Sequence, residues 1–355
     1  MYKSKCILVT GACGTIGREL VRQLLENYNA GEIIGIDNNE SELFFLEQRF
    51  LPYNARFYLT DIRDFHKIHR IMKGIDVVFH AAAFKHVILC ERSPFEAVQT
   101  NIMGINNLIV AASENQVEKF IFTSSDKAVN PTNVMGTSKL MGERIVTAAN
   151  ANERGSKAVL ASTRFGNVLG SRGSVIPIFR EQIRRGGPVT LTDPKMTRFI
   201  MSIQQAVGLV IDSAGLARGG EVFITKMPVI RIQDLAEVMI ETLAPRYGYK
   251  AEDIEVKIIG VKPGEKMYEE LMNTEETRRA IELEKYFVVV PAFTSIYRQV
   301  DYIYPKVVSK NVTNPYNSAN EKPLSKEALK DFLITNHLLE QDISAMENPT
   351  ERYFP

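Results

Sequence analysis

The chain has 355 residues, of which 45% are hydrophobic and 24% charged, and its formal net charge is +1. This length and composition predict a globular protein with a large core, and the near-zero charge excludes a global bias toward nucleic acid or membranes. No apolar run approaches the roughly 18 residues that span a bilayer, and the three cysteines show no paired spacing. We therefore expect no membrane insertion, no signal peptide, no metal site and a cytoplasmic location.

A glycine-rich turn and a helix with one apolar face follow the first expected strand, residues 6–10. That order is the context of a dinucleotide-binding loop. Gly11 would permit the tight turn, Gly14 would let a pyrophosphate approach the backbone, and Gly17 would let the helix pack closely on the strand. The helix N-terminus would offer amides to the phosphates. The cofactor-binding residues expected in this loop are Gly11, Gly14, Thr15, Ile16 and Gly17.

An acidic residue, Asp37, ends the second expected strand, residues 32–36. It lies 20 residues after Gly17, where a carboxylate would bind the adenosine ribose hydroxyls. Residues 38–40 hold no arginine that would accept a 2′-phosphate, so NAD is favoured over NADP. The alternative is that Asp37 caps the next helix.

The next two expected strands, residues 56–60 and 76–80, also end in residues suited to the cofactor. Asp61 and Ile62 follow the first of them, and Asp61 either accepts from the adenine amino group or caps a helix. After the second, small side chains would let the cofactor lie against the backbone, namely those of Ala81, Ala82 and Ala83.

The segment after the fourth strand holds further polar residues. His80 is interpreted as a packed strand-end histidine rather than a catalyst, and Lys85 could face the site. Ser93, followed by proline, predicts the start of a long helix that runs to about Asn115 and contains Asn101.

The fifth expected strand, residues 120–122, leads into a polar stretch. Ser125, Asp126 and Lys127 stand at its carboxyl end, and Lys139 follows in the next helical pattern. Ligands bind at this edge of an open parallel sheet. The alternative for Asp126 and Lys127 is an exposed ion pair, which contributes little to stability.

Strands and helices alternate as far as a sixth strand, which predicts an α/β, Rossmann-like, doubly wound parallel sheet. The regularity then breaks, and we interpret the later segments as a smaller, interleaved substrate domain. A strand at residues 222–225 is expected to return to the sheet. The expected domains are 1–167 with returning segments at about 195–228 for the dinucleotide, 168–194 and 229–340 for the substrate, and a tail over 341–355.

Three helix signals lie in the second half of the chain. Ser202 and Gln205 fit a capping box that opens a helix. Residues 262–266 form a charged turn, and we expect a helix after it. Residues 326–339 have the apolar spacing of an amphipathic helix.

These motifs resemble those of extended short-chain dehydrogenase/reductases, and more narrowly those of the nucleotide-sugar 4,6-dehydratases that act on UDP-N-acetylglucosamine in polysaccharide biosynthesis. The resemblance covers residues 3 to about 290 and implies NAD, a UDP-sugar substrate and a homo-oligomer. The residues that carry it are Gly11, Gly14 and Gly17, 80–86, 124–128, Asn130 with Pro131, 164–168 and 262–266.

One position departs from the family's usual Tyr-x-x-x-Lys. Met135 stands four residues before Lys139, and a thioether cannot serve as an acid or base. A subgroup of these dehydratases looks similar, with methionine here beside an intact Asp-Lys pair. Met135 together with Asp126 and Lys127 therefore indicates that subgroup.

The resemblance also implies a mechanism. NAD oxidises C4 of the sugar, the C5 proton becomes acidic, water leaves across C5 and C6, and the hydride returns to C6. Asp126 would be the acid at C6, Lys127 the base at C5, Lys139 the anchor of the nicotinamide ribose, and Ser125 the group that binds the C4 oxygen. With Met135 unable to act, we hypothesise that Asp126 also accepts the C4 hydroxyl proton. Lys127 must be partly neutral, which burial or nearby Lys139 would favour.

The same resemblance implies a set of substrate-binding residues, for two of which, Arg172 and Arg198, the alternative is simple surface solvation. An arginine suits a diphosphate because its planar fork binds two oxygens. The set is Lys85, Asn167, Arg172, Thr190, Arg198 and Glu265.

Two other functions stay open. A UDP-sugar 4-epimerase shares the fold, but it relies on the absent tyrosine and does not need the Asp126–Lys127 pair. A non-catalytic NAD-binding regulator would tolerate Met135, but it has no reason to keep that pair. Within the dehydratases, residues 129–135 look more like the configuration-retaining, membrane-anchored relatives than the C5-inverting ones, so retention is expected.

Overall fold

The structure is a computed structural model that describes residues 2–152, 158–170, 175–260, 265–293 and 300–340. The chain divides into two compact units. The larger contains residues 1–165, 204–226 and 270–315, and the smaller contains residues 166–203, 227–269 and 316–355.

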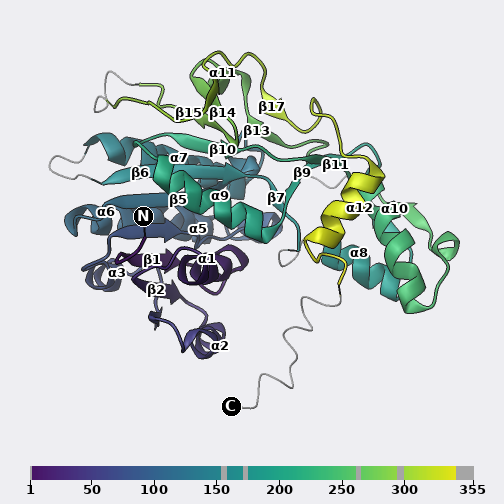
Figure 1. Cartoon of the computed structure of the whole chain (residues 1–355), viewed down its shortest axis with the longest axis horizontal. Helices are drawn as coiled ribbons and strands as arrows, with labels where there is room; N and C mark the ends of the chain where they lie inside the picture. The colour runs from purple at the N-terminus through teal and green to yellow at the C-terminus, as the bar shows by residue number, and fades with distance from the viewer. Residues whose placement is uncertain (1, 153–157, 171–174, 261–264, 294–299, 341–355) are drawn as a thin grey trace. The chain divides into compact units, whose positions relative to one another are not determined.

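A ten-stranded sheet forms the centre of the larger unit (Figure 1). Neighbouring strands pair in parallel from β3 through β2, β1, β4, β5 and β6 to β10, and antiparallel from β10 through β15 and β14 to β16. In spatial order the strands are β16 (Val307–Ser309), β14 (Ala280–Leu283), β15 (Tyr286–Val289), β10 (Val222–Thr225), β6 (Val159–Phe165), β5 (Lys119–Ser125), β4 (Val77–His80), β1 (Cys6–Thr10), β2 (Glu32–Asp37) and β3 (Ala55–Leu59).

The strand order reverses between β1 and β4. From β1 the chain proceeds to β2 and β3, and it then crosses to β4 and continues through β5 and β6 to β10. Thr10 and His80 are paired at the carboxyl ends of the two strands at the reversal. The predicted doubly wound sheet and its returning strand are confirmed, and ligands bind at such a switch point.

Helices pack on both faces of this sheet. On one face α3, α6 and α7 bury apolar side chains against β1, β2 and β5. On the other face α1 lies beside α9, and the Gln23 side-chain amide of α1 donates to the Gln204 carbonyl. Tyr2, which precedes β1, donates its hydroxyl to the Ile211 carbonyl of α9. The helices of the unit are α1 (Thr15–Glu26), α2 (Glu40–Phe50), α3 (Phe65–Ile71), α4 (Val87–Arg92), α5 (Pro94–Val98), α6 (Gly104–Glu114), α7 (Val134–Asn152), α9 (Ile203–Leu216) and α11 (Thr274–Thr277).

The long helix expected from Ser93 is interrupted. A π-helical segment, η1 (Gln99–Met103), joins α5 to α6, and the Ser93 side chain makes no capping hydrogen bond. In η1 the Asn101 side chain accepts from the backbone N–H of Phe84 at 2.8 Å and donates to the Phe84 carbonyl and the Ser138 hydroxyl. These side-chain hydrogen bonds give a physical reason for the π-helical segment, because they stabilise a backbone that departs from the regular α-helix.

Two expectations about residues 262–315 differ from the structure. A strand, β13 (Glu270–Met272), follows the charged turn in place of the expected helix, and only the short α11 comes after it. Residues 270–315, expected in the substrate domain, lie in the larger unit because β14, β15 and β16 extend its sheet. Residues 261–264 of the turn lie outside the described residues.

The smaller unit has two small sheets, β11–β9–β7 and β12–β8. Its helices α8, α10 and α12 share one apolar core, in which Leu329 and Leu333 of α12 are fully buried. Residues 326–339 thus have a core role, although the helix itself ends at Thr335. The bounds are β7 (Asn167–Val168), β8 (Val189–Leu191), β9 (Thr197–Met201), β11 (Val229–Arg231), β12 (Val256–Ile258), β17 (Tyr316–Asn317), α8 (Val175–Arg184), α10 (Ile232–Leu243), η3 (Ala244–Tyr247), η4 (Ala251–Asp253) and α12 (Lys326–Thr335).

Within the described ranges, no helix is both long and apolar enough to cross a bilayer. The same ranges hold no group of three or more His, Cys, Asp or Glu side chains placed to bind a metal ion.

Candidate functional site

The glycine loop after β1 is held by close backbone contacts. Gly11 has φ +67°, and a Cβ there would lie 2.7 Å from the backbone nitrogen of Ala82. A Cβ on Gly17 would lie 2.0 Å from the Gly11 carbonyl oxygen. Gly14 is exposed at the N-cap of α1 and has no side chain that could cap the helix. The first backbone amides of α1, those of Thr15, Ile16 and Gly17, therefore receive no side-chain cap. The backbone of the loop leaves no room for a side chain at Gly11 or Gly17, so only glycine can occupy these two positions.

Asp37, at the end of β2, ties this loop to the sheet. Its Oδ2 accepts from the backbone N–H of Cys13 at 3.0 Å, and its Oδ1 accepts from that of Asn39 at 3.0 Å. The N-cap of α2 is Asn39. The alternative that Asp37 caps this helix is therefore wrong.

A cavity of about 170 Å³ lies at the strand reversal, at the carboxyl ends of β1 to β4. Buried Thr60 lines it, and the Thr60 hydroxyl has no hydrogen-bond partner among the described residues. Arg63 pairs with Asp61 at 2.7 Å and holds the pKa of that carboxyl below its usual range. Since the N-cap of α3 is Asp64, the alternative that Asp61 caps it is wrong. The residues predicted to bind the cofactor that line this cavity are Gly11, Gly14, Asp37, Asp61, Ile62, Ala81 and Ala82.

A buried polar pair positions the alanines of this cavity. Thr10 Oγ1 lies 2.7 Å from His80 Nδ1 and accepts from the backbone N–H of Ala82 at 3.2 Å. The His80 ring stacks on Phe122 with centroids 5.6 Å apart. Burial, and secondarily the charge of Lys139, lowers the pKa of His80 to about 3. His80 is thus a neutral, packed strand-end histidine.

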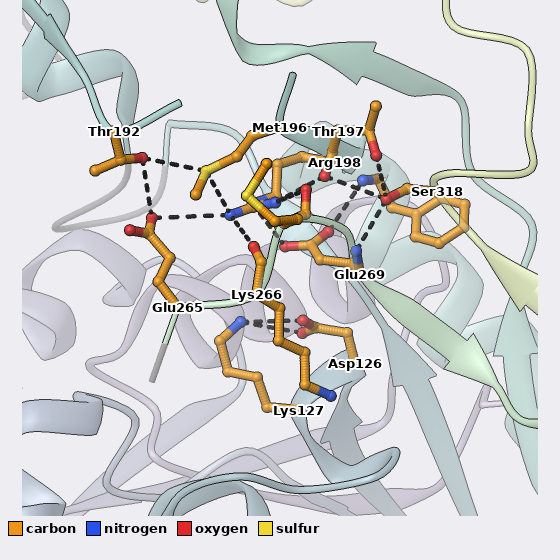
Figure 2. Close-up of polar contacts among 12 residues, drawn as sticks. Asp126, Lys127, Thr192, Met196, Thr197, Arg198, Glu265, Lys266, Glu269 and Ser318 are labelled. Carbon is orange, nitrogen blue, oxygen red and sulfur yellow. Dashed lines mark hydrogen bonds and ion pairs between the residues drawn. The ribbon is translucent and has the colours of Figure 1, made fainter. Parts of the chain in front are cut away.

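Asp126 and Lys127 form an ion pair directly after β5 (Figure 2). They begin a single turn, η2 (Asp126–Ala128). Lys127 Nζ lies 3.2 and 3.1 Å from the two carboxylate oxygens, and the Ser125 hydroxyl donates to Asp126 Oδ1 at 2.7 Å. The Asp126 side chain is 6% exposed and that of Lys127 is 36% exposed. The carboxylate is therefore not part of a solvated surface pair, and Lys127 is only partly exposed.

Lys139 enters the same region from α7. Its Nζ donates to the carbonyl of Thr123, near the end of β5, at 3.0 Å and lies 4.7 Å from the centroid of the Phe122 ring. Burial lowers the pKa of Lys139 to about 8, and Glu143 opposes that shift. The structure thus brings Ser125, Asp126, Lys127 and Lys139 to one strand end.

The lowered pKa of Lys139 makes stability depend on pH. Because the unfolded chain binds this proton more tightly than the folded chain, the free energy of unfolding rises with pH as the folded-state amine loses its proton. From pH 8 to pH 10 we expect a gain of about 2 kcal/mol in wild type relative to Lys139→Met. Urea denaturation of both proteins across this range measures the difference, and parallel pH profiles would contradict it. Both proteins carry the other titrating groups, so the subtraction isolates Lys139.

Met135 is buried in the first turn of α7 and packs with Cys90 and Ala97. Its backbone carbonyl accepts from the Ser138 hydroxyl at 2.7 Å, and Ser138 is also bound by Asn101. At this position the protein has an apolar contact and no titratable group.

In the smaller unit, Arg198 on β9 is bound by backbone carbonyls (Figure 2). Its guanidinium donates to the carbonyls of Thr197, Lys266 and Met267, and it lies 3.8 Å from Glu265 and 3.5 Å from Glu269. The side chain is 11% exposed. The structure therefore brings Arg198 and Glu265 together and uses the arginine to order residues 265–269.

The other predicted substrate residues are more scattered. Thr190, on β8, exchanges two hydrogen bonds with the Gln182 side chain. Asn167 is half-buried on β7, and Lys85 is exposed in the loop after β4. Arg172 lies outside the described residues.

Sequence reasoning missed two polar networks of the larger unit. Arg164, at the end of β6, is fully buried between Glu143 and Glu276, at 2.6 and 3.0 Å. Asn101 joins the loop after β4 to α7. The signal for Arg164 was its place in the motif of residues 164–168, but nothing in the sequence identified its partners.

One protein family and several individual proteins match this chain over most of its length. The profile of a family described as polysaccharide biosynthesis protein matches residues 7–291. An uncharacterized membrane protein, MJ1061, of Methanocaldococcus jannaschii is 52% identical over 94% of this chain and 96% of its own. A UDP-N-acetylglucosamine 4,6-dehydratase (inverting) of Campylobacter jejuni is 37% identical over 95% and 99%. A UDP-glucose 4-epimerase of Rickettsia felis is 35% identical over 97% and 99%.

The chain spans about half the length of two other curated relatives. It covers 53% of the capsular polysaccharide biosynthesis protein CapD of Staphylococcus aureus, at 40% identity. It covers 46% of EpsC, a probable polysaccharide biosynthesis protein of Bacillus subtilis, at 43% identity.

Solved structures share the fold. Pen from Bacillus thuringiensis superposes with a TM-score of 0.86 at 41% identity, over 95% of this chain and 99% of its own. The dTDP-glucose 4,6-dehydratase DesIV from Streptomyces venezuelae, solved with NAD bound, has a TM-score of 0.63 over 74% of this chain and 86% of its own. At 23% identity, DesIV supports the fold alone.

Proposed function

Because the chain belongs to the polysaccharide biosynthesis protein family, we propose that it is an NAD-dependent 4,6-dehydratase of UDP-N-acetylglucosamine that retains configuration at C5. The observation that carries this proposal is the buried Asp126 carboxylate, which accepts from Ser125 and Lys127 at the carboxyl end of β5. An acid and a base side by side are what elimination of water from a 4-keto sugar requires. The relatives of this family include both dehydratases and epimerases, and the pair favours the dehydratase.

The residues that line the cavity at the strand reversal support binding of a dinucleotide there. The glycine loop would bind the pyrophosphate, Asp37 the adenosine ribose, and Asp61 the adenine. A carboxylate beside the ribose disfavours a 2′-phosphate, which supports NAD over NADP. When bound, NAD would supply the hydride acceptor and donor.

The side chains at the end of β5 would handle the protons. Ser125 would hold the C4 oxygen, and Asp126 would accept the C4 hydroxyl proton and later pass it to the departing C6 oxygen. Lys127 would remove the C5 proton and, once the hydride has returned to C6, would give a proton back to C5 on the same face. Its side chain is 36% exposed, so the amine is open to solvent. Lys139, anchored on Thr123, would add positive potential and bind the nicotinamide ribose.

Binding of the nucleotide is assigned to the residues named from the sequence. In the smaller unit these are Asn167, Thr190, Arg198, Glu265 and Arg172, and in the larger unit Lys85. Because Arg198 already binds three carbonyls, we expect its main effect to be on the position of Glu265.

Incubation with UDP-N-acetylglucosamine and NAD tests the function. We expect a product lighter by one water, detected by mass spectrometry, with no net reduction of NAD, because the hydride returns within each turnover. An isomer of unchanged mass would indicate an epimerase, and unchanged substrate would favour a non-catalytic NAD-binding protein. NMR of the product formed in deuterated water reports the configuration at C5, and inversion would contradict the proposed retention alone.

A further inference from the structure

A second hollow in the larger unit lies at the opposite ends of the strands that form the cofactor cavity. The cofactor cavity lies at the carboxyl ends of β1 to β3, whereas this hollow includes Cys6, Glu32 and Arg56, at or near their amino ends. It has a volume of about 510 Å³, and the end of α3 and the turn at Gly74 complete it. Small-molecule sites fall in this size range.

The charge of this basic hollow is unbalanced. Four cationic side chains line it, and Glu32 is the one acid among its lining residues. Arg56 lies 3.3 Å from Glu32 and offsets it, and Lys67 donates to the carbonyl of Leu59. Among the described residues, Arg70 and Lys73 form no ion pair, and both are exposed. The lining therefore has a net positive charge of about three, in a chain whose net charge is +1.

The dipole of α3 offsets only part of this charge. Basic residues near a helix C-terminus offset its partial negative charge, which is roughly half an elementary charge. Arg70 lies in the last turn of α3 and Lys73 follows it. Their two positive charges together exceed the partial negative charge of the helix end. Arg56 lies on β3, and so its position owes nothing to the helix.

The hollow also has apolar walls. Ile34, Ile71 and Ile75 line it, together with Tyr58, which is 41% exposed. Cations above apolar walls suit a ligand with an anionic group and a less polar body, since the cations bind the anion and the walls bury the rest.

We propose that the basic hollow binds a phosphate-bearing small molecule at a site separate from that of the cofactor. Arg70 and Lys73 contact the phosphate oxygens, and Arg56 turns from Glu32 toward them. Tyr58 packs against the body of the ligand. This site does not depend on the proposed dehydratase activity, because none of its residues belongs to that machinery.

Calorimetric titration of the full chain, saturated with NAD, with inorganic pyrophosphate tests the proposal. Saturation removes binding at the cofactor cavity, and unchanged binding by the double variant described next would attribute the probe to the substrate-binding residues and overturn the proposal. We expect the double variant Arg70→Gln/Lys73→Gln to bind the probe at least about tenfold more weakly, because each lost cation removes a charge-assisted contact. The affinity should also fall with added salt.

The matched control is Arg49→Gln/Lys3→Gln, which removes two exposed positive charges of the same unit outside the basic hollow. It should bind pyrophosphate as wild type does. No binding to wild type, or equal loss in both double variants, would overturn the proposal. A parallel sedimentation with phosphatidylglycerol vesicles distinguishes the source of the phosphate. Vesicle binding that needs Arg70 and Lys73, without binding of pyrophosphate, would also overturn the small-molecule assignment.

Discussion

Replacing Asp126 with Asn is expected to lower turnover of UDP-N-acetylglucosamine by at least about 100-fold, the usual contribution of a general acid or base. The amide keeps the size of the side chain but can neither take the C4 proton nor return it to the C6 oxygen. Ser125 and Lys127 both donate to the Asp126 carboxylate in the structure. In the variant, a neutral amide oxygen, which is a weaker acceptor, replaces the carboxylate. Product formation by mass spectrometry measures the effect.

Two measurements keep this prediction specific. The Asp126→Asn protein should bind NAD as wild type does, because the cofactor cavity is not lined by Asp126. Asp64→Asn removes the same charge at the N-cap of α3, where asparagine caps as well as aspartate, and it should retain full turnover. Full turnover by Asp126→Asn would exclude the proton-transfer role, whatever the reaction proves to be.

Replacing Arg164 with Met is expected to destabilise the protein by about 3–5 kcal/mol, the cost of leaving buried charges without their partner. The guanidinium is 1% exposed and binds both carboxylates and the carbonyl of Leu271. Burial opposes its charge, but Glu143 and Glu276 prevail and raise the pKa of Arg164. Denaturant unfolding monitored by circular dichroism measures the loss.

The control for this prediction is Arg63→Met. Arg63 also lies between two carboxylates, those of Asp61 and Glu96, but its side chain is 41% exposed, so the expected loss is below about 1 kcal/mol. Adding Glu143→Gln to Arg164→Met should recover part of the stability, because one unpaired charge is removed. Equal losses in Arg63→Met and Arg164→Met would contradict the buried network.

Much of the larger unit follows from local patterns. The strand that ends at Thr10, the glycine turn and the strand that ends at Asp37 are all predictable, because apolar spacing and glycine positions are properties of a few consecutive residues. The sites of Asp126 and Lys127 at the end of β5 follow from the same reasoning. The residues lining the cofactor cavity lie together for the same reason, since parallel strands end at one edge of the sheet.

What local patterns could not reveal lies in contacts between distant segments. Arg164 binds Glu276, which is 112 residues away, and no local signal links the two. The η1 turn depends on bonds from Asn101 to Phe84 and Ser138, which override a helical pattern. The partial burial of Lys127 was not predictable from the sequence, because burial depends on how the surrounding elements pack.

By itself, the sequence determined the doubly wound sheet, the dinucleotide loop and the placement of an acid and a lysine at one strand end. These depend on periodicity and spacing, which act within single elements. Only the tertiary structure decided that residues 270–315 extend the sheet, that Arg198 binds carbonyls of its own unit, and that four cations gather in the basic hollow. The reason is physical: hydrogen bonds, ion pairs and packing between segments form only once the chain has brought them together.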